Sequence, residues 1–99
     1  MKWRSSAYRL QEDYFTKLAI TLTSWKLGDV DAEIKERRVD STHSLICLRI
    51  WKVDGDNRTK IADLEIGKVI RGPGISMAYF LTEYEFEARI REVLEKVKA

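Results

Sequence analysis

Two alternating segments around a short polar loop constrain this chain most strongly. The segments HSLICLRIWKV (43–53) and TKIADLEIGKV (59–69) alternate apolar with polar residues, and the loop DGDNR lies between them. Alternation with a period of two is typical of β-strands, and a loop rich in turn-forming residues joins two such strands into an antiparallel hairpin. The sequence therefore predicts a β-hairpin in the middle of the chain.

The apolar pattern also selects the register of this hairpin. If Val53 pairs with Thr59, one face carries only apolar pairs: Ile46–Ile66, Leu48–Leu64 and Ile50–Ala62. The other face then places Arg49 opposite Asp63, a stabilising pair of opposite charges. A shift by one residue would exchange the core face with the solvent face. We therefore predict the register that begins at Val53 and Thr59.

In this register Trp51 and Ile61 lie together on the face away from the apolar pairs. The chain has 3 Trp, 4 Tyr and 3 Phe, which are many bulky groups for 99 residues. Contiguous exposed apolar area usually marks an interface, and symmetric dimers are the commonest oligomers. We therefore predict a homodimer with Trp51 and Ile61 as its candidate interface.

The C-terminal segment TEYEFEARIREVLEKVKA (82–99) has the pattern of an amphipathic helix. Thr82 and Glu85 have the spacing of a capping box. Apolar residues recur at helical spacing on one side: Phe86, Ile90, Val93 and Val97. Since only one stripe is apolar, we expect this helix to pack on the sheet.

The N-terminal segment SAYRLQEDYFTK (6–17) predicts a helix capped by Ser5 or Ser6. The next segment, Ala19–Leu27, has two interpretations. Its β-branched residues favour a strand, which a Gly28-Asp29 turn would join to the strand that follows. Apolar residues at helical spacing, with Gly28 after the last turn, favour a longer first helix. We prefer the strand.

The stretch VIRGPGISMAYF (69–80) contains the only proline, Pro73. A phosphate-binding loop needs several free backbone N–H groups at the mouth of a helix, whereas proline removes one donor. We therefore predict a turn before a short strand, with Arg71 as the contact if an anion binds. The whole chain, 1–99, is then a single α+β domain: an N-terminal helix, an antiparallel sheet of four or five strands, and a C-terminal amphipathic helix.

Residues that could support catalysis or metal binding are few. His43 is the single histidine, and an enzyme that uses it with Asp40 or a distant carboxylate is our third hypothesis. Cys47 lies in an apolar run and is predicted to be a small buried hydrophobe. The acidic residues around Asp54 do not match the ligand spacing of an EF-hand. We therefore predict no metal, no cofactor and no enzymatic activity.

The only dense basic run is KERRVD, which contains Lys35, Arg37 and Arg38. With Arg71, and with Trp51 as a stacking platform, these residues are the candidate contacts for nucleic acid. However, the formal net charge is only +2 and acidic residues interleave with the basic ones. Nucleic-acid binding is therefore the alternative, and a non-catalytic protein that self-associates and binds a macromolecule is preferred.

Composition bears on where such a protein works. The segment MKWRSSAYRL has no apolar core of a signal peptide, and no apolar run is long enough to span a bilayer, so we expect a cytoplasmic protein without a membrane segment. Single Asn and Gln residues beside 34% charged residues are typical of proteins from hot environments, which predicts thermostability.

In its length, its scarcity of Asn and Gln, and the stretches EFEARIREVLEKVKA and IWKVDGDNRTKIADLEI, the chain resembles small uncharacterised proteins of filamentous viruses infecting hyperthermophilic archaea. The resemblance implies a heat-stable, often dimeric protein of the host cytoplasm. It assigns a role to no residue.

Overall fold

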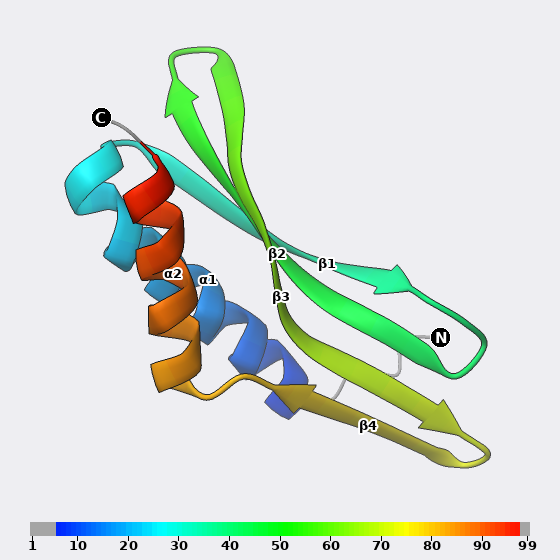
Figure 1. The fold of residues 1–99 in the computed structure, drawn as a ribbon. Coiled ribbons are helices and arrows are strands. Elements are labelled where there is room, and N and C mark those ends of the chain that lie inside the picture. The colour runs from blue at the N-terminus through cyan, green and yellow to red at the C-terminus, as the bar shows by residue number, and fades with distance from the viewer. Residues whose placement is uncertain (1–5, 98–99) are drawn as a thin grey trace.

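The fold is a four-stranded antiparallel sheet with two helices, described by a computed structural model over residues 6–97. The elements follow one another as α1 (Ser6–Leu27), β1 (Val30–Arg38), β2 (His43–Asp54), β3 (Asn57–Gly72), β4 (Ile75–Phe80) and α2 (Glu83–Lys96) (Figure 1). The strands lie in the order β1-β2-β3-β4, so each one pairs with its neighbours in sequence. The predicted α+β class is confirmed.

Helix α1 continues to Leu27, so the prediction of a strand from Ala19 is wrong, and so is the hairpin turn at Gly28-Asp29. Gly28 instead ends the helix at φ 81°, with its N–H donating to the Ser24 carbonyl oxygen at 2.8 Å. The buried positions Phe15, Ala19 and Thr23 recur every four residues. Burial of this stripe therefore overrides the strand preference of the β-branched residues. The proposed cap Ser5 lies outside the described residues.

The central hairpin has the predicted register only in its middle. Leu48 pairs with Leu64, and the neighbouring pairs Arg49–Asp63 and Ile50–Ala62 also hold. Toward both ends the register shifts, because Ile66 and Ile61 have no partner residue on β2. The predicted pairs Ile46–Ile66 and Val53–Thr59 are therefore wrong, because β3 contains two β-bulges.

The stretch RGPG turns the chain between β3 and β4, as predicted. Gly72 pairs with Ile75, so Pro73 and Gly74 form the turn, and Gly74 has a φ of 73°. A positive φ is accessible to glycine without strain. This hairpin defines β4 as one edge of the sheet, and β1 is the other edge.

Helix α2 begins with the predicted capping box. The Glu85 N–H donates to the Thr82 hydroxyl oxygen at 3.1 Å, and the Thr82 N–H donates to a Glu85 carboxylate oxygen at 3.0 Å. The hydrogen bond from the Thr82 N–H is the main reason why the pKa of Glu85 is lowered. Near its other end the Lys26 ammonium donates to the Leu94 carbonyl oxygen at 2.7 Å, which ties α2 to α1.

The two helices lie side by side against one face of the sheet (Figure 1). Phe15 of α1 meets the ring of Phe86 edge-on, with centroids 4.9 Å apart, and stacks on Phe80 at 5.7 Å. We call this side the covered face; four residues of β2 are buried on it: Ser44, Ile46, Leu48 and Ile50. The alternating residues of β2 point to the other side, which we call the open face.

Candidate functional site

The part of the open face near the β2–β3 turn carries charged side chains in pairs. Arg49 lies 3.3 Å from Asp63, and Lys60 lies 4.0 Å from the same carboxylate. Arg58 lies 2.9 Å from a carboxylate oxygen of Asp31. Since these pairs are exposed, this part of the sheet is a hydrated surface with balanced charge.

Trp51 and Ile61 do not form the predicted shared surface. Ile61 is the bulge residue of β3 and packs against the core. Trp51 stays in a row with Asp31 and Lys60, and the guanidinium of Arg58 lies 4.8 Å from its ring centroid. The indole N–H is buried without a hydrogen-bond partner among residues 6–97. Arg58 therefore occupies a face of the ring that a stacking platform would need.

Strand β4 carries the densest exposed apolar surface. Ile75, Met77 and Tyr79 alternate along it toward the open face and are 62%, 50% and 44% exposed. Leu45 and Ile70, which lie on the same face of neighbouring strands, are half-buried. We call these five residues the β4 patch. The other exposed large apolar residues of the described chain lie apart on the helices and one turn: Tyr14, Trp25, Val39 and Tyr84.

Two basic side chains lie beside the residues of the β4 patch. Arg37 pairs with Leu45, which pairs with Lys68, which pairs with Tyr79, so these residues form one row across the sheet. The Lys68 ammonium lies 5.8 Å from the Tyr79 ring centroid. The Tyr79 hydroxyl donates to the Met77 sulfur at 3.5 Å. The patch is therefore an apolar and aromatic surface with Arg37 at its border and Lys68 between Leu45 and Tyr79.

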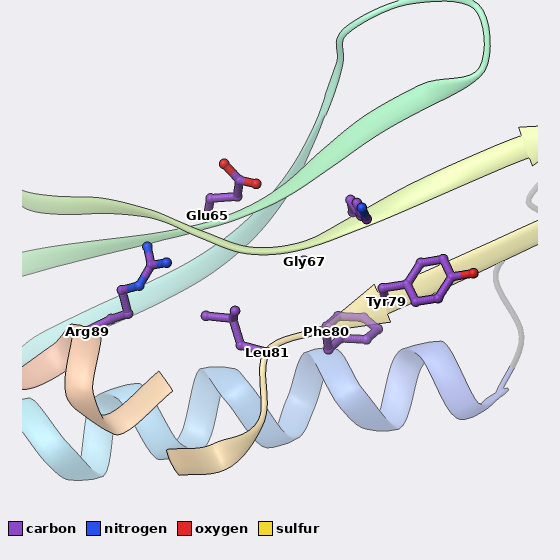
Figure 2. A pocket seen from close by; sticks show the side chains of 7 residues that line it. Glu65, Gly67, Tyr79, Phe80, Leu81 and Arg89 are labelled. Carbon is purple, nitrogen blue, oxygen red and sulfur yellow. The ribbon is translucent and has the colours of Figure 1, made fainter. Parts of the chain in front are cut away.

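A pocket of about 300 Å³ opens where β4 ends and the chain turns toward α2 (Figure 2). Its walls come from β3, β4 and α2: Glu65, Gly67, Lys68, Tyr79, Phe80, Leu81 and Arg89. Figure 2 shows the Leu81 side chain rising between Arg89 and Phe80. Gly67 allows β3 to approach β4 closely, because a Cβ there would collide with the Tyr79 carbonyl oxygen.

The candidate nucleic-acid contacts are divided between the two faces. Lys35 and Arg37 lie on the open face, opposite Cys47 and Leu45 of β2. Arg38 and Arg71 lie on the covered side, where Arg71 donates to Ser44 Oγ at 2.9 Å and forms an ion pair with Glu36. The residues Glu36, Arg38, Ser44 and Arg71 line a shallow pocket of about 380 Å³. The four basic candidates therefore do not form one surface.

His43 is the first residue of β2, directly after the turn from β1. Its Nδ1 lies 3.1 Å from Asp40 and 2.7 Å from the Thr42 hydroxyl. Asp40 also accepts the backbone N–H groups of Thr42 and His43, both at 2.8 Å. The bond from the Thr42 N–H, followed by that from the His43 side chain, lowers the pKa of Asp40 to about 2. These contacts are typical of a hydrogen-bonded turn, in which the Asp40 carboxylate contacts two backbone N–H groups as well as the imidazole.

Cys47 is buried, as predicted, and burial is the main cause that raises the pKa of its thiol. Among residues 6–97, no three His, Cys, Asp or Glu side chains gather closely enough to hold a metal ion. Neither α1 nor α2, within the described chain, is long and apolar enough to cross a membrane.

Comparisons with protein-family models, with curated proteins and with solved structures found no match to this chain.

Sequence reasoning missed the β4 patch, although a signal for it was present. The strand ISMAYF contains no charged residue in a chain that is 34% charged. An uncharged segment of this kind is typical of either a buried strand or an interface. The two interpretations are distinguished only by the structure, in which both helices lie on the covered face and leave the other face of β4 exposed.

Proposed function

We propose that this protein is a non-catalytic interaction protein that self-associates through the β4 patch and its edge strand. The observation that carries the proposal is the exposure of Ile75, Met77 and Tyr79 side by side on one uncharged strand. Burying apolar surface lowers the free energy by roughly 25 cal/mol per Å². A strand of this kind at a sheet edge is therefore stabilised by contact with another protein surface.

A second copy of the chain is the partner that this surface fits best. A charged partner surface would have to be desolvated against apolar side chains without compensating contacts. The β4 patch itself offers a matching surface of the same neutral, apolar kind. In a two-fold dimer the patch of one copy meets the patch of the other, as closed symmetry requires.

The test is sedimentation equilibrium of the wild-type protein and a Met77→Lys variant at tens of micromolar. We expect the wild type to have twice its monomer mass of 11.6 kDa. The variant should sediment as a monomer, because two-fold symmetry brings the two introduced charges close together in an apolar contact.

Val39→Lys is the matched control, since Val39 is 58% exposed but lies in the turn between β1 and β2. It should leave the dimer intact. A monomeric wild type, or equal behaviour of the two variants, would refute self-association through the β4 patch.

Binding of single-stranded nucleic acid is the alternative function, now supported by a different set of residues. Lys35, Arg37 and Lys68 lie on the open face, and the Lys68 ammonium lies 5.8 Å from the ring centroid of Tyr79. Cations beside an aromatic ring on an open sheet are typical of single-strand binding surfaces. Against this alternative, the acidic residue Glu65 lies on the same face, in one row with Cys47 and Lys35.

Sedimentation with a mixed-sequence oligonucleotide at about 50 and 200 mM salt distinguishes the two functions. Binding through several phosphate contacts weakens steeply over this range. A complex that forms at low salt, and is lost in Lys68→Glu, would favour the alternative. A dimer that ignores the oligonucleotide would favour self-association.

We further propose that the protein is heat-stable. The proposal is supported by single Asn and Gln residues and by ion pairs that extend over β1, β2 and β3. Ion-pair networks lose less of their contribution on heating than isolated pairs do. Thermal unfolding followed by circular dichroism tests it: a midpoint in the range of about 45–65 °C, usual for proteins of moderate-temperature organisms, would contradict it.

A further inference from the structure

The pocket at the end of β4 contains charged side chains that have no part in the proposed self-association. It lies where β3 continues beyond the last residue pair of the β3–β4 hairpin. Glu65 contributes to its wall from β3, and Arg89 contributes from α2. Figure 2 shows these two side chains at one end of the pocket and Tyr79 at the other. Two elements that lie apart in the sequence therefore bring opposite charges to one pocket.

Glu65 and Arg89 do not neutralise each other. Neither side chain forms an ion pair with any residue among residues 6–97. A molecule that bears both an ammonium group and a carboxylate can contact both residues, because a carboxylate accepts from the planar guanidinium of an arginine and an ammonium group donates to a glutamate. An α-amino acid carries these two groups on one carbon, so this end of the pocket fits the α-carbon end of an amino acid.

The other end of the pocket adds a second cation. The Lys68 ammonium lies 5.8 Å from the Tyr79 ring centroid and, in the part of the chain that the structure describes, has no carboxylate partner. The Leu81 side chain, which Figure 2 shows between Arg89 and Phe80, offers an apolar contact in the middle. A ligand that spans the pocket is therefore expected to have methylene groups in its middle and a second anionic group near Lys68.

We propose that this pocket binds a free acidic α-amino acid. Glu65 and Arg89 contact its α-ammonium and α-carboxylate groups, and Lys68 contacts its side-chain carboxylate. The two cations and one anion of the pocket are then complementary to the two carboxylates and one ammonium group of the ligand. A polyanion without an ammonium group, such as a phosphate ester, is disfavoured because the Glu65 carboxylate repels it.

The size of the pocket suits such a ligand, and its exposure limits the affinity. A volume of about 300 Å³ is at the small end for ligand pockets and admits a molecule of about ten non-hydrogen atoms. Glu65, Lys68 and Arg89 are exposed, so water weakens each charged contact. We therefore expect a Kd on the order of 1–10 mM for L-glutamate.

Titration of the ¹⁵N-labelled protein with L-glutamate, followed by NMR, tests the site. The amide signal of Gly67, in the wall of the pocket, should shift and saturate at about 50 mM ligand, several times the expected Kd. The amide of Gly55, in the β2–β3 turn, is the control and should not shift. Sodium chloride at equal ionic strength should move neither signal. Shifts without saturation, or equal shifts of the two glycines, would overturn the proposal.

A ligand series tests the charges of the proposed occupant. Glutarate has both carboxylates of L-glutamate but no ammonium group, and L-glutamine has the α-groups but no second carboxylate. Each should bind at least about threefold more weakly than L-glutamate, as expected for the loss of one exposed charged contact. Glutarate that binds as tightly as L-glutamate would overturn the amino-acid assignment and leave an anion site.

Substitutions at the exposed charged positions assign each contact. Arg89→Gln should weaken all three ligands. Glu65→Gln should remove the preference for L-glutamate over glutarate, and Lys68→Gln should remove the preference for L-glutamate over L-glutamine. Arg91→Gln is the matched control, because Arg91 is on the same helix but lines a different pocket, between α1 and α2. Equal binding by Arg89→Gln and Arg91→Gln would overturn the assigned site.

This inference does not depend on the proposed self-association, and the two can fail separately. Met77 does not line the pocket, so Met77→Lys should still bind L-glutamate when it is monomeric. A monomeric wild type that binds L-glutamate would refute self-association and support the pocket. A dimeric wild type whose Gly67 signal does not respond to L-glutamate would overturn this inference alone.

Discussion

The two faces of the sheet are made by the same strands but have different roles. On the covered face Ile46, Leu48 and Ile50 of β2 are buried beneath the helices. On the open face the intervening position Arg49 is partly exposed and paired with Asp63. The difference teaches that stability is concentrated on one face, while the other is free to carry interactions. An exposed apolar group on the open face, such as the β4 patch, is therefore not needed to hold the monomer together.

Phe86→Ala should give the largest effect, because it breaks the covered face. Phe86 is fully buried and meets the ring of Phe15. Removing a buried phenylalanine side chain typically costs about 3–5 kcal/mol of unfolding free energy, from lost burial and from the cavity. Unfolding in urea or guanidinium chloride measures it. Tyr84→Ala, at an exposed position of the same helix, should change stability by less than about 0.5 kcal/mol. Equal losses in the two variants would mean that α2 does not cover the sheet as described.

Part of the covered face could be predicted from the sequence. Helix α2, its capping box and the pairs Leu48–Leu64 and Ile50–Ala62 follow from local spacing and from apolar alternation. Such patterns are reliable because one-sided burial imposes the same period on the sequence.

Gly67→Ala should have the next largest effect, because it disturbs the close approach of β3 to β4. A Cβ at this position would collide with the Tyr79 carbonyl oxygen of the neighbouring strand. Overpacking of this kind typically costs about 1–3 kcal/mol. Gly72→Ala is the matched control in the same hairpin, since a Cβ there would meet no atom within 4 Å. Denaturant unfolding of both variants compares them, and an unchanged Gly67→Ala variant would show that β3 and β4 can separate at low cost.

Three features could not be read from the sequence, and each depends on contacts between distant residues. The segment Ala19–Leu27 is helical because Ala19 and Thr23 are buried in the core, which local β-propensity does not reveal. The bulges at Ile61 and Ile66 insert single residues into an otherwise regular alternation. Trp51 and Ile61 were the predicted interface, but the bulge turns Ile61 to the core and Arg58 lies over Trp51. The β4 patch is therefore the better candidate interface.

Thr82→Ala should have a smaller effect, because it removes a cap and leaves the covered face packed. The Thr82 hydroxyl accepts the Glu85 N–H, which would otherwise lack a partner within the helix. Replacing such a cap by alanine typically costs about 1 kcal/mol. Thr21→Ala, at an exposed position within α1, should be neutral or slightly stabilising because alanine has the higher helix propensity. Chemical denaturation distinguishes these outcomes, and equal stability of the two variants would show that the cap contributes nothing.

The smallest expected effect lies on the open face, in the pair formed by Arg49 and Asp63. Both side chains are more than a third exposed, and their closest atoms are 3.3 Å apart. A double-mutant cycle with Arg49→Ala and Asp63→Ala should give a coupling energy of about 0.2–1 kcal/mol, as for other exposed pairs. Lys60 lies 4.0 Å from the same carboxylate and can partly replace Arg49, which lowers the expected coupling. Raising the ionic strength from about 0.1 to 1 M shortens the screening length from about 10 to 3 Å and should reduce the coupling further. A coupling above about 2 kcal/mol that resists salt would mean that this face is shielded from water, and the contrast between the two faces would then be wrong.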